Sequence, residues 1–130
     1  MKTNNWIKIS ALSLAIGVAL GAIGAHALKD LINNQQLDWW NKGVFYQLIH
    51  SIGILIIALI SGIKPEMKLK WSLRIMLIGI FMFSGSLYVL AINKGFLGDI
   101  TLIKYCMIPL TPIGGLCFIV SWILLFIKVK

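Results

Sequence analysis

The hydrophobic pattern divides the chain into four long apolar stretches joined by short polar segments. The stretches cover residues 9–28, 43–63, 71–92 and 105–127. Each reaches the length of about 20 residues that an α-helix needs to cross a hydrocarbon core. Arg74 is the only charged residue inside them, and its long side chain can reach the nearby interface. The pattern predicts an all-α fold, a four-helix transmembrane bundle.

The polar segments between the stretches are too short to form a soluble domain. The longest of them, residues 29–42 and 93–104, contain 14 and 12 residues. An independently folding domain usually needs about 50 residues or more. We therefore interpret residues 1–130 as a single integral membrane domain.

Composition supports this interpretation and changes the meaning of the charge. The chain is 59% hydrophobic and 12% charged, whereas an average soluble domain is about 25% charged. A net charge of +8 would suggest nucleic acid as the partner of a soluble protein. Here there is too little polar surface for a soluble fold, so we exclude nucleic acid and use the basic residues to predict topology.

The basic residues fall mainly on one side of the predicted spans. Eight of them share that side: Lys2, Lys8, Lys64, Lys68, Lys70, Arg74, Lys128 and Lys130. The other side carries four lysines and three aspartates: Lys29, Lys42, Lys94, Lys104, Asp30, Asp38 and Asp99. The positive-inside rule then predicts that both termini are cytoplasmic.

The first stretch has a second interpretation as a secretory signal. Lys2 and Lys8 precede an apolar run that ends at residues 25–27 (AHA), a small-x-small pattern typical of a cleavage site. Cleavage would leave three spans. We expect the uncleaved, four-span form, because a histidine-bearing continuation is not typical of a signal peptide.

The fourth stretch contains two prolines that are expected to disturb a helix. Pro109 and Pro112 each lack a backbone N–H, and they free the carbonyls of Tyr105 and Ile108. Thr111 directly before Pro112 is typical of a helix start. We expect this helix to be kinked or broken at the prolines.

Small residues indicate where helices pack closely. The first span carries Ser13, Gly17, Gly21 and Gly24 on one face. Its opposite face carries Ala15, Ala19, Ala22 and His26. Such residues let backbones approach in a membrane, so we expect the first helix inside the bundle, although the Gly17/Gly21 pair could also mediate dimerisation. The predicted helix-packing glycines are Gly17, Gly21, Gly24, Gly85, Gly114 and Gly115.

Polar residues gather in the half of each span that faces outward in the predicted topology. Counting about 1.5 Å per residue from the outer ends brings them to one layer, since the inner halves are almost purely Ile, Leu, Val and Phe. A polar side chain in hydrocarbon must face protein. The layer predicts a polar pocket open to the outside, formed by His26, Tyr46, Gln47, His50, Ser84, Ser86, Tyr88 and Thr111.

The spans contain little that could support catalysis or proton-coupled export. No carboxylate lies within a span, which counts against a small multidrug-type exporter. The two histidines make an incomplete metal site, and there is no CxxC, Ser-His-Asp set, phosphate loop or HExxH motif. We therefore predict no enzyme activity, no metal and no cofactor.

Four segments together resemble a known family. These are residues 21–29 (GAIGAHALK), 46–50 (YQLIH), 83–88 (FSGSLY) and 111–115 (TPIGG), followed by Trp122. In this order they closely resemble the domain of unknown function 423 family of small bacterial membrane proteins, which is similar to the transmembrane protein 256 group. The resemblance implies four helices and no established reaction. Ile23 and Ala27 replace residues that are often Phe and Gly in such proteins.

Three hypotheses for the function follow. The first is a membrane-supporting or scaffold protein of the cytoplasmic membrane, with an outward-facing polar pocket and without enzymatic chemistry. The second is a small channel or transporter that uses the histidine-containing layer. The third is an accessory subunit of a larger membrane complex. The expected partners are the lipid bilayer and either further copies or another membrane protein.

Overall fold

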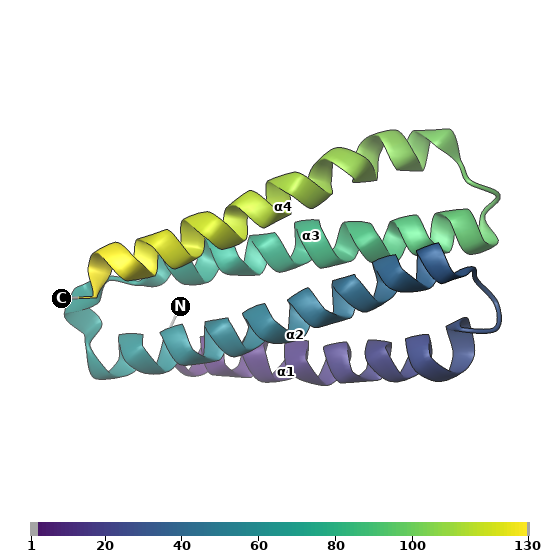
Figure 1. Cartoon of the computed structure of the whole chain (residues 1–130). Helices are drawn as coiled ribbons and strands as arrows, with labels where there is room; N and C mark the ends of the chain where they lie inside the picture. The colour runs from purple at the N-terminus through teal and green to yellow at the C-terminus, as the bar shows by residue number, and fades with distance from the viewer. Residues whose placement is uncertain (1–2, 130) are drawn as a thin grey trace.

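The structure is a computed structural model that describes residues 3–129. Its long helices are α1 (Thr3–Ile23), α2 (Asn34–Ile63), α3 (Lys70–Phe96) and α4 (Thr101–Lys128), and a π-helical turn at Gly24–Leu28 continues α1. A single 3-10 turn, Pro65–Met67, lies between α2 and α3. Consecutive long helices run antiparallel to each other, as Figure 1 shows. All four are long and apolar enough to cross a membrane, which confirms the predicted all-α, four-span fold.

The two ends of the bundle differ in charge. The start of α1, the connection between α2 and α3 and the end of α4 lie at one end (Figure 1). We call this the basic end, because it carries Lys64, Lys68, Lys70, Arg74 and Lys128. The opposite, mixed-charge end carries Asp38, Lys42, Lys94, Asp99 and Lys104. The cytoplasmic assignment of the basic end stays a prediction.

The helices are longer than the apolar stretches because local hydrogen bonds extend them. α2 begins at Asn34, well before the apolar stretch that starts at residue 43. Asn33 accepts a hydrogen bond from the Gln36 backbone N–H at 3.0 Å, and the Gln36 side chain accepts one from the Asn33 N–H at 2.9 Å. This capping box satisfies two N–H groups at the helix start. Hydropathy alone does not contain this signal.

The prolines do not break the fourth helix. α4 continues through Pro109 and Pro112 (Figure 1), so the predicted break and the helix start at Thr111 are wrong, whereas the kink stays a prediction. Both prolines are exposed and three residues apart, so they share the face turned away from α3. Proline is tolerated inside transmembrane helices where the surroundings re-satisfy the freed carbonyls.

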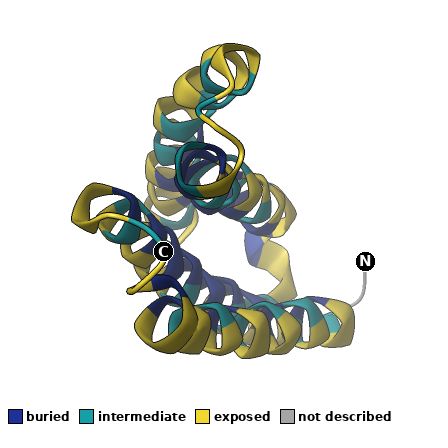
Figure 2. Cartoon of the chain, turned by 90° about the vertical axis from the view of Figure 1, so that its right-hand side faces the viewer, coloured by how far each residue is buried: buried dark blue, intermediate teal, exposed yellow. Residues whose placement is uncertain are grey.

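The first helix lies at the edge of the bundle rather than inside it. Its Gly17 and Gly24 are buried against α2, whereas Ala15, Ala19 and His26 are exposed. α1 therefore packs through one of its two small-residue faces, contrary to expectation. Figure 2 shows the buried positions turned towards the interior and the exposed positions turned outward.

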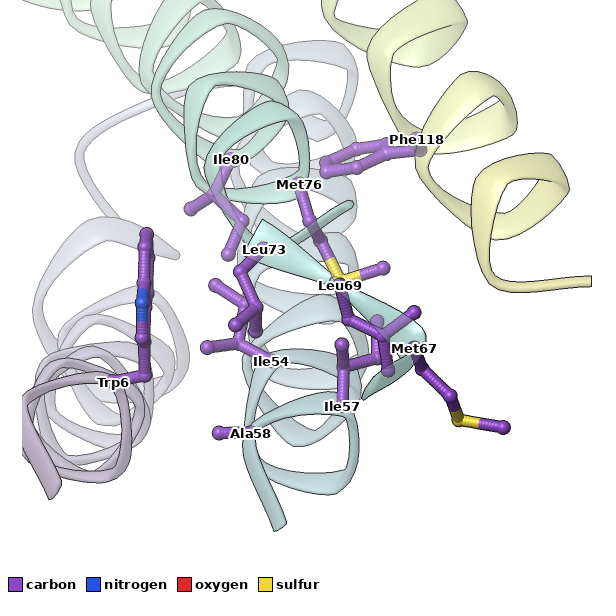
Figure 3. Packing of buried hydrophobic residues seen from close by; sticks show 10 residues of the cluster. All are labelled: Trp6, Ile54, Ile57, Ala58, Met67, Leu69, Leu73, Met76, Ile80 and Phe118. Carbon is purple, nitrogen blue, oxygen red and sulfur yellow. The ribbon is translucent and has the colours of Figure 1, made fainter. Parts of the chain in front are cut away.

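The main hydrophobic core lies towards the basic end. Its central residues Ile54, Ile57 and Met76 are fully buried. Trp6 reaches them from α1 and Phe118 from α4, so all four helices contribute (Figure 3). The full set is Trp6, Ile54, Ile57, Ala58, Met67, Leu69, Leu73, Met76, Ile80 and Phe118.

Candidate functional site

Gln47 connects three helices in the predicted polar layer. Its side-chain amide on α2 donates a hydrogen bond to the Ser13 carbonyl of α1 at 2.9 Å. The Tyr88 hydroxyl of α3 donates to the Gln47 side-chain oxygen at 2.9 Å. Gln47 is buried, and both ends of its amide are used for interhelical contacts. The residue therefore fixes α1 and α3 against α2.

Ser86 and Thr111 join α3 to α4 in the same way. Their hydroxyl oxygens lie 2.7 Å apart. Ser86 also donates to the Phe83 carbonyl at 2.9 Å. Because a serine hydroxyl has one proton, Thr111 must donate to Ser86 when Ser86 donates to Phe83. The prediction that these side chains act together is consistent with this geometry.

His50 lies among aromatic rings. Its Nδ1 atom is 2.8 Å from the Tyr46 carbonyl of the same helix, and a carbonyl can only accept, so Nδ1 carries a proton. The ring stacks on Phe118 with centroids 3.5 Å apart and 10° between the planes. Trp122 and Tyr46 complete the surroundings, with centroids 6.3 Å and 5.7 Å away. His50 is thus buried by protein and does not face lipid.

Two predicted residues take no part in these contacts. His26 is exposed in the π-helical turn, so the structure does not bring it to the layer. Ser84 is buried, but its hydroxyl has no hydrogen-bond partner among residues 3–129. The predicted set therefore divides into a Gln47–Tyr88 pair, a Ser86–Thr111 pair and the aromatic surroundings of His50 and Tyr46.

Serine contacts outside the predicted layer were missed from the sequence. Ser10 donates to the Ser51 carbonyl at 2.7 Å, and the Ser13 and Ser51 hydroxyls are 2.7 Å apart, which joins α1 to α2. Near the basic end Ser72 and Ser121 each donate to the other's carbonyl, at 2.9 and 2.7 Å. The inner halves of the spans are therefore not purely apolar. Serines at matched depths on neighbouring helices were the available signal.

Asn93 is another polar residue that the sequence analysis did not identify. It is fully buried at the end of α3. Its side-chain amide donates to the Ile100 carbonyl at 3.1 Å, and its side-chain oxygen accepts from the Ile100 N–H at 3.0 Å. The side chain thereby holds the turn that leads into α4, in which Gly98 and Asp99 have positive φ.

Trp40 belongs to the packing between α1 and α2. Its indole N–H donates to the Leu20 carbonyl at 2.8 Å, and the ring is buried. A Cβ on Gly24 would lie 2.7 Å from the Trp40 ring, so glycine is required for this approach. Gly17 and Gly21 likewise face Leu48 and Val44 of α2.

The glycines of α3 and α4 differ from one another. A Cβ on Gly114 would meet the backbone of Phe83, with the Cα atom 2.9 Å away. A Cβ on Gly115 would make ordinary contacts of 3.7 Å with the Phe83 ring, and one on Gly85 would meet nothing within 4 Å. Gly114 is therefore a position at which α4 lies directly against the backbone of α3.

Gly85 instead borders a groove between α1 and α3. The groove has a volume of about 520 Å³ and is lined mainly by apolar side chains, among them Leu12, Ile16 and Phe81. Gln47 and Tyr88 reach it, but their polar atoms are bonded to each other. The groove is thus suited to apolar groups rather than to ions.

The described part of the chain contains no grouping suited to a metal. Within residues 3–129 no three His, Cys, Asp or Glu side chains lie close enough together to hold an ion. Cys106 is exposed and Cys117 is partly buried, and neither is in a disulfide. The observed chemistry is that of neutral hydrogen bonds between helices.

These features define a class of small, four-span integral membrane protein held together by interhelical hydrogen bonds and close glycine contacts. Comparison with known proteins gives the family. Residues 20–115 match the family described as "Protein of unknown function (DUF423)", and the chain belongs to this family. The resemblance of the sequence motifs is thereby confirmed.

Named relatives occur in several bacteria. The chain is 38% identical to a UPF0382 membrane protein of Staphylococcus epidermidis, over 94% of this chain and 92% of the relative. It is 35% identical to the UPF0382 membrane protein YwdK of Bacillus subtilis, over 94% and 93% of the two chains. It is 34% identical to the UPF0382 inner membrane protein YgdD of Escherichia coli, over 91% and 83%. No solved structure matches the chain.

The relatives and the helices agree on location. The protein is a multi-pass protein of the bacterial cytoplasmic membrane. The family has no known function, and the names of the relatives contain no reaction.

Proposed function

We propose that the protein is a non-enzymatic scaffold or accessory protein of the cytoplasmic membrane, which acts by packing within the bilayer. The observation that carries the proposal is that several of its intramembrane polar groups form hydrogen bonds between its own helices. Gln47 bonds to Ser13 and Tyr88, and Ser86 bonds to Thr111. Side chains that already have partners stabilise a bundle, whereas a solute pathway needs polar groups that remain available to the solute.

The surroundings of His50 support packing rather than proton transfer. A proton relay needs titratable side chains that are joined to one another or to water by hydrogen bonds. The His50 ring lies between Phe118, Trp122 and Tyr46, and its Nδ1 proton is held by a backbone carbonyl. His26 is exposed in the π-helical turn that follows α1. The two histidines are thus not brought together as one site.

Substitution of His50 separates a packing role from a titrating role. His50→Gln keeps a hydrogen-bond donor of similar reach, so we expect the bundle to keep its stability within about 0.5 kcal/mol. His50→Leu lacks a donor for the Tyr46 carbonyl, and we expect it to cost about 1 kcal/mol. The measurement is thermal unfolding of the purified proteins in one mild detergent. Equal losses for both variants would contradict a role as a simple hydrogen-bond donor.

The competing function, a small channel or transporter, makes a different prediction for the same variant. Gln cannot take up a proton between about pH 5 and 8. A conduit that uses His50 would therefore lose transport in His50→Gln while the protein remained folded. A scaffold would show no transport that depends on this residue.

A further inference from the structure

The basic end of the bundle contains a hollow that is lined by charged side chains on one side and by apolar side chains on the other. It has a volume of about 960 Å³ and lies where the connection between α2 and α3 meets the end of α4. Lys68, Lys70 and Lys128 line its charged side. Trp71, Ile75 and Leu124 line its apolar side, on α3 and α4. A ligand that fills both sides must have a negatively charged end and an apolar end.

No acidic side chain among residues 3–129 forms an ion pair with the lysines of this hollow. In residues 3–129 the ion pairs are Lys42 with Asp38, at 2.9 Å, and Lys104 with Asp99, at 2.8 Å. Both pairs lie at the mixed-charge end. The connection between α2 and α3 contains Glu66 as its one acidic residue, and that carboxylate is not paired with any of the three lysines. Within the described part of the chain, the hollow therefore presents uncompensated positive charge.

The start of α3 adds to the positive potential. α3 begins at Lys70, and its N-cap residue Leu69 supplies no side-chain hydrogen bond. The N–H groups of a first helical turn carry a partial positive charge and favour an anion. Ser72, in that turn, lines the hollow.

The depth of the hollow matches the surface of a membrane. Trp71 is exposed and lies beneath the Arg74 guanidinium, which is 5.3 Å from its ring centroid. Tryptophan and arginine in this arrangement are typical of the level of the lipid headgroups. The apolar wall continues from this level towards the hydrocarbon core.

We propose that this hollow is a binding site for one anionic phospholipid. The ammonium groups of Lys68, Lys70 and Lys128 contact the phosphate and headgroup. An acyl chain lies against Ile75 and Leu124, between α3 and α4. Basic pockets between helices are a known means of holding anionic headgroups. The site goes beyond the proposed function, since a scaffold and a conduit could each use it.

The test compares two variants that lose the same charge at opposite ends. One is Lys68→Gln/Lys70→Gln/Lys128→Gln, and the control is Lys42→Gln/Lys94→Gln/Lys104→Gln. The full-length purified proteins in mild detergent are titrated with phosphatidylglycerol or with phosphatidylcholine of the same acyl chains. Native mass spectrometry counts the bound lipids, and circular dichroism checks that each variant is folded.

We expect the native protein to bind one phosphatidylglycerol at least tenfold more tightly than phosphatidylcholine. Each lysine near an anionic lipid contributes about fivefold, so the basic-end variant should lose this preference. The control variant should keep it. An equal loss in both variants would show a response to net charge alone and would overturn the site.

A further variant tests the apolar wall. A competition experiment with inorganic phosphate then distinguishes a phospholipid site from a site for free phosphate. Leu124→Trp fills the wall without changing the charge, and we expect it to weaken phosphatidylglycerol binding at least fivefold. Inorganic phosphate at millimolar concentration should not displace the lipid. Full displacement by inorganic phosphate, or unchanged binding in Leu124→Trp, would contradict a phospholipid site.

Discussion

Gly114→Ala is expected to lower the free energy of unfolding by about 1–3 kcal/mol, the usual cost of forcing extra atoms into a packed core. The added Cβ would lie 2.8 Å from the Phe83 Cβ and 2.9 Å from its Cα. The Cα atom belongs to the α3 backbone and the Cβ atom is fixed to it, so the α3 backbone must move. The gain in helix propensity from glycine to alanine, up to about 1 kcal/mol, is too small to offset this cost. Thermal unfolding in detergent measures the difference.

The neighbouring glycine supplies the control. Gly115→Ala adds the same methyl group to the same helix, but its Cβ would contact the Phe83 ring at 3.7 Å, an ordinary van der Waals distance. We expect this variant to be as stable as the native protein or slightly more stable. Equal destabilisation by Gly114→Ala and Gly115→Ala would mean that the close approach of α4 to α3 is not as described.

Gln47→Leu is expected to lower the free energy of unfolding by about 1–2 kcal/mol. The variant loses the hydrogen bonds to the Ser13 carbonyl and from the Tyr88 hydroxyl, and interhelical hydrogen bonds in membranes average about 0.6 kcal/mol each. The Tyr88 hydroxyl would also be left without its partner, which adds a desolvation cost. Thermal or denaturant unfolding of the purified protein provides the measurement.

A double-mutant cycle tests whether Gln47 acts through Tyr88. Tyr88→Phe removes one of the two hydrogen bonds and should cost about 0.6 kcal/mol. The double variant Gln47→Leu/Tyr88→Phe should then be more stable than the sum of the single effects indicates, because residues in direct contact are not additive. Strict additivity would contradict the Gln47–Tyr88 contact.

The number of spans could be predicted because few backbone structures can cross the hydrocarbon core of a membrane. A chain that crosses a bilayer must satisfy its backbone hydrogen bonds internally, so an apolar stretch of sufficient length forms a helix. The same constraint explains why α4 continues through Pro109 and Pro112 despite the loss of two N–H groups. Local rules from soluble proteins gave too much weight to Thr111 and Pro112 as a helix start.

The position of each helix in the bundle was harder to predict. Small residues indicate that a helix face can pack closely, but they do not indicate which helix packs against it. Both faces of α1 carried such residues, yet α2 covers only the face with Gly17 and Gly24. His26 was assigned to the polar layer by depth alone, and its direction around the helix leaves it exposed. The π-helical turn at Gly24–Leu28 has no signal that a count of 100° per residue can detect.

The polar contacts were predicted in part. Matched depth placed Gln47, Ser86, Tyr88 and Thr111 in one layer but did not predict which of them pair, and the structure pairs Gln47 with Tyr88 and Ser86 with Thr111. The reciprocal Ser72–Ser121 bonds were missed because serine is common in helices and carries little hydropathy signal. A protein can use such residues for packing wherever two helices meet, so depth alone does not define a pocket.

Proton flux into liposomes tests the central claim, that the intramembrane polar groups serve packing rather than conduction. Purified native protein and folded His50→Gln are reconstituted with a pH-sensitive dye inside the vesicles, and a pH gradient is imposed. We predict that both proteins acidify the lumen no faster than protein-free liposomes do. A flux that is present with the native protein and absent with folded His50→Gln would contradict the claim and establish a conduit through His50.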